Sequence, residues 1–198
     1  MRKVLALGAH FDDIEIGIGG ILEKHVSVND EVYMAITDSN ENRTGDINIR
    51  YREQLKAMNI IGVKKQRLLL FNMEEDISNV VEILDKLNPD IIYTHFEKDT
   101  HQAHRRCSHI GQAIGRKSDT QVFFYNSGAA YDFTPNTFYP VLPSYKSRLL
   151  KCFKSQIAKK AVNIESIQKR EAYWSTIVKS ETGYMEALLV KKMLYKIR

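Results

Sequence analysis

The chain has 198 residues, of which 43% are hydrophobic and 27% are charged, and its formal net charge is +5. These values are typical of an ordinary globular domain and exclude long disordered tracts and collagen-like repeats. No uninterrupted run of about 18 apolar residues is present to span a membrane. We therefore expect a single domain over residues 1–198.

The cysteines and the charge of the C-terminal third predict the cellular compartment and the possible partners of the protein. Cys107 and Cys152 are far apart and form no CxxC pair, and the apolar run near the start breaks at Gly8, so a reduced, cytoplasmic setting without a signal peptide is favoured. Residues 146–198 carry 13 Lys or Arg against 4 Glu. Such a surface can attract a phosphate-bearing substrate, an anionic membrane or nucleic acid, but a merely solvated face is the favoured interpretation.

Short β-branched runs alternate with segments of helical period along residues 1–125. Strands are predicted at Val4–Ala9, Glu31–Thr37, Arg67–Phe71, Asp90–His95 and Gln121–Tyr125. Helices are predicted at Ile14–Lys24, Ile47–Ile61, Ile77–Leu87 and His101–Arg116. This order predicts the α/β class: a Rossmann-like three-layer sandwich with a mostly parallel central sheet, followed by C-terminal helices.

The last third of the chain has a different pattern. Residues 126–145 hold three of the four prolines and predict irregular structure with a short strand near Phe138–Leu142. Helices are predicted at Tyr145–Lys159 and Asn163–Lys179. Residues 183–198 show an apolar stripe beside lysines, which is typical of an interfacial helix, although packing on the domain is favoured. The stripe consists of Met185, Leu188, Leu189, Met193 and Leu194.

Four of the six histidines lie where two predicted strands end. The first strand leads into Ala9-His10-Phe11-Asp12-Asp13, and the fourth leads into the stretch from His95 to His104. Ligands bind at the carboxyl ends of the strands of an open α/β sheet. A catalytic zinc site needs three protein ligands, from histidine and carboxylate, and an open position for water. His10 and Asp13 can converge on one ion, and a histidine from the fourth helix can complete the set.

Each cluster also has a structural interpretation. A histidine at a strand end is commonly just hydrogen-bonded, and Asp12 or Asp13 can cap the helix that follows. Two such clusters at matching ends of one sheet favour catalysis. Asp12 would then stand beside the ion and take a proton from water, while zinc lowers the pKa of that water from about 15.7 towards about 7.

The two clusters resemble the signatures of a known family. Ala9-His10-Phe11-Asp12-Asp13 is similar to the AHPDD motif of the LmbE or PIG-L family of zinc-dependent N-acetylglucosaminyl deacetylases. Residues 99–104, Asp-Thr-His-Gln-Ala-His, are similar to the second motif of that family. Weaker likenesses extend from Thr37-Asp38 to residues 184–187, Tyr-Met-Glu-Ala, and so cover nearly the whole chain.

The resemblance implies a role for each matching residue. His10, Asp13 and His104 would hold Zn²⁺, or Fe²⁺, which suits the same ligands, and Asp12 would act as the general base. His101 would stabilise the tetrahedral intermediate or protonate the leaving amine. The predicted substrate-binding residues are Arg50 and Asp99. An exposed Arg50–Glu53 pair along a helix is the alternative for Arg50.

The chain departs from the family pattern at two positions. Phe11 replaces the proline of the first motif, which alters the stiffness of the turn. Ala103 replaces the aspartate that orients the catalytic histidine, and the loss of such a partner typically costs about 10- to 100-fold in affinity or activity. Asp99 or Glu97 is the candidate replacement.

The leading functional hypothesis is an amidohydrolase that removes the N-acetyl group from a GlcNAc-type sugar in a glycoconjugate, nucleotide sugar or lipid-linked glycan. The alternative is a non-hydrolytic nucleotide-binding α/β domain in which Asp38 contacts a ribose. The expected partner is a small molecule, with no nucleic acid. Peripheral membrane contact and a homo-oligomer are left open. Specificity is expected to lie in loops 38–49 and 126–145.

Overall fold

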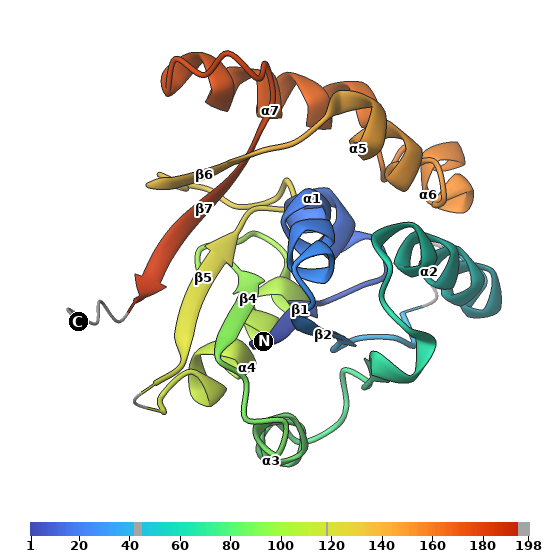
Figure 1. Ribbon diagram of the computed structural model, residues 1–198. Helices are drawn as coiled ribbons and strands as arrows, with labels where there is room; N and C mark the ends of the chain where they lie inside the picture. The colour runs from blue at the N-terminus through green and yellow to red at the C-terminus, as the bar shows by residue number, and fades with distance from the viewer. Residues whose placement is uncertain (42–44, 118, 194–198) are drawn as a thin grey trace.

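The computed structural model describes residues 1–41, 45–117 and 119–193, which fold around a seven-stranded sheet in the order β3-β2-β1-β4-β5-β7-β6 (Figure 1). The first five strands of this order run parallel. β7 runs antiparallel to both β5 and β6. The strands are β1 (Lys3–Gly8), β2 (Glu31–Ile36), β3 (Leu68–Leu70), β4 (Ile91–His95), β5 (Gln121–Tyr125), β6 (Thr137–Pro140) and β7 (Met185–Lys192).

Helices cover both faces of the sheet, so the predicted three-layer α/β fold is confirmed. The helices are α1 (Asp13–Ser27), α2 (Ile47–Ile61), α3 (Ile77–Asp85), α4 (Gln102–Ile114), α5 (Pro143–Leu150), α6 (Lys154–Ala158) and α7 (Ile164–Ile177), with a 3₁₀ turn at Lys65–Arg67. Because side chains alternate along a strand, β1 sends Val4 to the layer of α1, α2 and α5, and Leu5 to the layer of α3 and α4. Among the described helices, not one combines the length and the apolar character needed to cross a bilayer.

Helix α1 lies very close to the sheet. A Cβ atom on Gly17 would overlap the ring of Tyr125, so the glycine permits this close packing. The helix is kinked at Ile18, whose φ is −144°. Beyond the kink, the amides of Gly20 and Ile21 donate to the carboxylate of Glu186, both at 2.8 Å. A strand near the end of the chain thus anchors the helix that begins at Asp13.

Two predictions in the C-terminal third are wrong. The segment expected to form a helix from residue 183 is the strand β7, in which Met185–Leu188 are buried in succession because β5 and β6 flank them. Leu194 of the apolar stripe lies outside the described residues. The predicted helix Tyr145–Lys159 is two helices, α5 and α6, separated at residues 151–153, where the buried Phe153 leaves helical geometry. Boundaries of the other predicted elements differ from the observed ones by three residues or fewer.

Candidate active site

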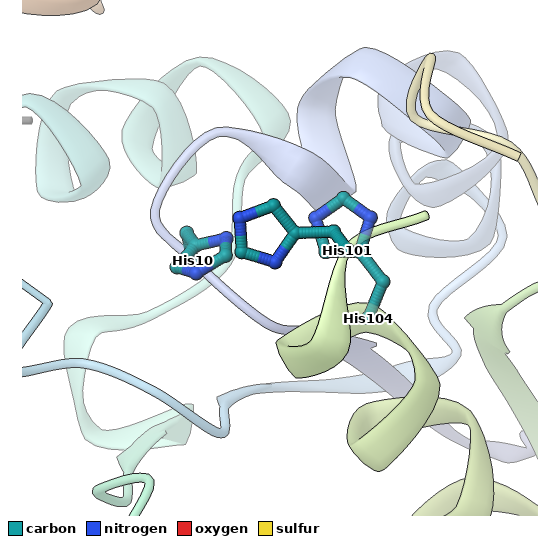
Figure 2. A group of neighbouring side chains, drawn as sticks. All are labelled: His10, His101 and His104. Carbon is teal, nitrogen blue, oxygen red and sulfur yellow. The ribbon is translucent and has the colours of Figure 1, made fainter. Parts of the chain in front are cut away.

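The site lies where the order of the parallel strands reverses. β2 and β4 flank β1 on opposite sides, so the connections that follow β1 and β4 diverge and leave a crevice at their carboxyl ends. His10 follows β1, and His101 and His104 stand at the start of α4, which follows β4. Figure 2 shows these three imidazoles grouped together.

Two of the predicted metal ligands, His10 and His104, converge on the carboxylate of the third, Asp13. Asp13 Oδ1 lies 3.4 Å from His104 Nε2, and Asp13 Oδ2 lies 3.4 Å from His10 Nδ1. The amide of His10 also donates to Asp13 Oδ2 at 2.8 Å, which fixes the turn that carries both residues. All three side chains are largely buried. The structure therefore brings together the ligand set that the sequence proposed.

The chemistry of this cluster fits a divalent ion. His10 Nε2 is buried and has no hydrogen-bond partner among the described residues, as expected of a nitrogen kept for another ligand. Two overlapping groups, His10-His101-His104 and Asp13-His95-His104, each place their ligand atoms within 4.8 Å of one another. Two imidazoles and a carboxylate are donors that suit zinc or iron(II).

Asp99 lies behind His104, one of the candidate metal ligands, and supports its ring. Its carboxylate accepts the His101 amide at 2.7 Å and lies 3.0 Å from His104 Nδ1. This pairing leaves His104 Nε2 directed towards Asp13, as in the carboxylate–histidine–metal arrangements that fix a ligand's tautomer. Both oxygens of Asp99 are engaged in this way, which favours an orienting role over the predicted contact with substrate. Asp99 holds the His104 ring and the His101 backbone, so it does not reproduce the support that an aspartate at Ala103 would give to the His101 ring.

Asp12 has the properties of a proton acceptor beside the cluster. Its φ of 105° is rare for a residue with a side chain, and such backbone strain is typical of active sites. Burial, followed by the charge of Asp13, raises the pKa of Asp12 well above the ordinary value, while Arg50 and His10 oppose the rise. A carboxylate that is costly to keep charged takes up a proton readily.

Arg50 is buried in the wall of the site. Its Nη1 donates to the Glu41 carboxylate at 2.7 Å, and its Nη2 donates to the Phe11 carbonyl at 3.2 Å. The alternative Arg50–Glu53 surface pair is wrong, because Glu53 is also buried and accepts from the amide and hydroxyl of Ser155. Arg50 thus joins α2 to the turn that carries Asp12.

A cavity of about 770 Å³ opens onto these residues. Its walls come from the two segments expected to hold specificity: Asp38 and Glu41 on one side, and residues 127–129 on the other. The second wall is tied to the second motif, since the amide of Thr100 donates to the Ala129 carbonyl at 3.2 Å. A cavity of this size suits a small-molecule ligand.

Two residues at the site had no such role in the sequence analysis. Asp38, considered there as a ribose ligand, has its Oδ2 atom 3.6 Å from His10 Nε2, and so lies beside the candidate metal ligands. His95 is fully buried behind them, with its ring stacked on His104 at 4.0 Å between centroids. Its position at a strand end next to the second motif was the available signal.

Comparison with known proteins identifies the family. The model of the family described as PIG-L, GlcNAc-PI de-N-acetylase, matches residues 5–114. The chain belongs to the PIG-L family. Among curated proteins, this PIG-L-family chain is 25% identical over 157 residues to the uncharacterized deacetylase YaiS of Escherichia coli K12, covering 73% of this chain and 84% of that protein.

Other relatives extend the comparison. The diacetylchitobiose deacetylase of Thermococcus kodakarensis is 28% identical over 128 residues, which cover 56% of this chain and 48% of that protein. The structure of N,N'-diacetylchitobiose deacetylase from Pyrococcus horikoshii has a TM-score of 0.77 at 19% identity, covering 96% of this chain and 83% of that one. The hydratase GalB of Pseudomonas putida shares the fold with a TM-score of 0.77 at 14% identity, covering 100% and 99%. The fold alone therefore does not decide the reaction.

Proposed function

We propose that this protein is a metal-dependent amidohydrolase that removes the N-acetyl group from a GlcNAc-type sugar, within a glycoconjugate, a nucleotide sugar or a lipid-linked glycan. The observation that carries the proposal is the convergence of His10, Asp13 and His104 on one point, with Asp12 and His101 beside it at the mouth of a cavity. The similarity to diacetylchitobiose deacetylase supports an N-acetylated sugar as substrate.

The metal would supply the electrophilic part of the chemistry. A zinc or iron(II) ion held by His10, Asp13 and His104 would lower the pKa of a water molecule and polarise the acetamide carbonyl. Asp99 fixes the tautomer of His104, so that the Nε2 atom is the one available to the ion.

Asp12 and His101 perform the proton chemistry. Asp12 takes a proton from the attacking water while the oxygen of that water bonds to the carbonyl carbon. In the metal-free protein, burial, followed by the charges of His10 and His104, lowers the pKa of His101. A neutral His101 imidazole can donate a hydrogen bond to the oxyanion. The C–N bond then breaks, and the proton held by Asp12 passes to the leaving nitrogen. The products are acetate and a free amino sugar.

Two aspartate variants and a substrate panel test the proposal. Asp13→Ala is expected to lose both bound metal and acetate release. Asp12→Asn is expected to keep the metal but to release acetate about 10²- to 10⁴-fold more slowly, because only the base is removed. Metal content is measured by elemental analysis and acetate release over a panel of N-acetylhexosamine conjugates. Full activity in Asp13→Ala, or equal activity of Asp12→Asn and the unmodified protein, contradicts the mechanism.

A further inference from the structure

Ser127 lies between the wall of the cavity and His95, the buried histidine behind the candidate metal ligands. It follows β5 by two residues, and β5 pairs with β4 so that Tyr125 lies opposite His95. Ser127 lines the cavity, whereas His95 is fully buried behind it. The Ser127 Oγ atom is 3.4 Å from His95 Nδ1. The hydroxyl is therefore in contact with both the cavity and the imidazole.

The surroundings of His95 fix which ring nitrogen carries the hydrogen. The amide of Ala9 donates to His95 Nε2 at 3.2 Å, so this nitrogen acts as an acceptor. Asp13 Oδ2 is also 3.2 Å from Nε2, but the buried Ala9 amide has no other hydrogen-bond acceptor among the described residues and so needs the lone pair of Nε2. A neutral imidazole that accepts at Nε2 carries its hydrogen on Nδ1. Rings of His104 and Tyr125 contact the imidazole and hold its plane.

The direction of the next hydrogen bond follows. His95 Nδ1–H donates to Ser127 Oγ, and the serine hydroxyl hydrogen is then available for a second partner. Two features define the backbone of the loop around Ser127. The Asn126 side chain accepts the amide of Gly128 at 2.7 Å, and Gly128 has a φ of 130°. The partner that this arrangement fits is a hydrogen-bond acceptor inside the cavity.

We propose that Ser127 is a substrate-contacting residue whose hydroxyl donates to an acceptor oxygen of the N-acetylated sugar, and that His95 is the positioning residue that fixes this direction. The sugar as ligand rests on the function proposed above. The direction of the hydrogen bonds rests only on the contacts of Ala9, His95 and Ser127. We call the hydrogen bonds from Ala9 to His95 and from His95 to Ser127 the relay. Because the relay leaves Ser127 with a hydrogen to donate, Ser127 favours a ligand group that accepts a hydrogen bond over one that can only donate.

Nitrogen-15 NMR of the zinc-loaded protein tests the relay without any substrate. In spectra that correlate ring nitrogens with carbon-bound ring hydrogens, His95 is expected to show a protonated Nδ1 and an unprotonated Nε2. Assignment comes from the loss of these signals in His95→Gln. A protonated Nε2 on His95 overturns the proposal, because that tautomer would donate to Asp13 and accept from Ser127.

Kinetics on N,N'-diacetylchitobiose and its monodeoxy analogues test the contact with substrate. Ser127→Ala is expected to raise the KM about fivefold, with kcat within about twofold, as for the loss of one neutral hydrogen bond made throughout the reaction. One deoxy analogue should show the same KM with Ser127→Ala as with the unmodified protein. Ser27→Ala, at the exposed end of α1 and outside the cavity lining, is the control and should leave KM unchanged.

Two substitutions of His95 separate the relay from packing. His95→Asn keeps an N–H group near the position of Nδ1, and His95→Gln places its amide near Nε2, while both remove the ring that stacks on His104. The KM of His95→Asn should stay within about twofold of the unmodified value, and that of His95→Gln should rise to the Ser127→Ala value. Equal KM values for the two variants, or no effect of Ser127→Ala in a protein that releases acetate, overturn the proposal. If the unmodified protein releases no acetate from any substrate, the proposed function fails, and the NMR result still decides the relay.

Discussion

At the scale of single residues, the carboxylates around His10 set its protonation state, and that state affects how the site binds a metal. Burial alone would lower the pKa of His10, but the neighbouring carboxylates of Asp13 and Asp38 outweigh it and raise that pKa to about 10 in the absence of metal. The imidazole is therefore protonated at pH 7. A protonated imidazole cannot ligate a metal, so a bound ion must replace that proton.

Metal binding is accordingly expected to release protons. Addition of Zn²⁺ to the metal-free protein at pH 7 should release at least one proton per ion, measured by calorimetry in buffers of different ionisation enthalpy. Asp38→Asn should release less, because loss of a nearby carboxylate lowers the pKa of His10. Zinc binding whose enthalpy is the same in all buffers would contradict the predicted protonation of His10.

The candidate metal ligands could be proposed from the sequence, but the contacts that support them could not. His10, Asp13 and His104 could be proposed because each follows a strand or starts a helix at one edge of the sheet. The contacts of Asp99 with His104, and the stacking of His95 beneath it, depend on side-chain positions that spacing along the chain does not define. Arg50 lines the cavity, as does its partner Glu41, which could not be predicted from the sequence.

At the scale of helices and strands, a buried ion network ties the end of the chain to α1. Lys146 of α5 is fully buried, 2.6 Å from Glu186 of β7 and 3.0 Å from Glu171 of α7. Glu186 in turn accepts the two amides beyond the kink of α1. Removal of one partner from a buried ion pair leaves an uncompensated charge.

Lys146→Met is therefore expected to lower the free energy of unfolding by about 3–5 kcal/mol, measured by chemical denaturation. The matched control is Lys169→Met, which breaks the exposed pair with Glu165 and should cost at most about 0.5 kcal/mol. Similar losses in the two variants would show that the buried network does not stabilise the fold.

The same region shows why some elements could not be predicted. The strands and helices of residues 1–125 follow local periodicity and lie close to their expected positions. β7 does not, because its apolar residues also fit a helical stripe, and its strand geometry depends on β5 and β6, which are distant in the sequence. The break between α5 and α6 has no proline or glycine to mark it. Both features arise from tertiary packing.

At the scale of the whole molecule, the two ends of the parallel sheet have different roles. The carboxyl end holds the strained Asp12 and the candidate metal ligands. The amino end is closed by Asp30, which accepts from the Arg2 side chain at 2.8 Å and lies 2.8 Å from His25 Nδ1. His25 continues the network to the hydroxyl of Tyr93 in β4, at 2.9 Å. The end of the sheet opposite the site is thus held by a hydrogen-bonded network that runs from Arg2 through Asp30 and His25 to Tyr93.

This network predicts how stability depends on acid. Burial opposes the shift, but hydrogen bonds from His25 and Arg2 outweigh it and lower the pKa of Asp30 to about 2. A carboxyl group whose pKa is lower in the folded state stabilises the fold at higher pH, and this contribution is lost as the pH falls from about 4 towards about 2. Asp30→Asn should therefore lower the free energy of unfolding by about 2 kcal/mol at pH 7 and remove this part of the acid loss.

His25 adds a second component to the pH dependence of the free energy of unfolding, at a higher pH than Asp30. Its pKa is lowered, chiefly by burial, so protonation below about pH 6.5 favours the unfolded chain. Asp30→Asn removes the acceptor that opposes this shift, and the variant should lose stability at least as steeply as the unmodified protein when the pH falls below about 6.5. Denaturation curves of both proteins between about pH 7 and about pH 2 measure the two components, with Asp132→Asn, from the exposed pair with Lys98, as the control. Parallel curves below about pH 4 would show that Asp30 does not account for the acid sensitivity of the fold.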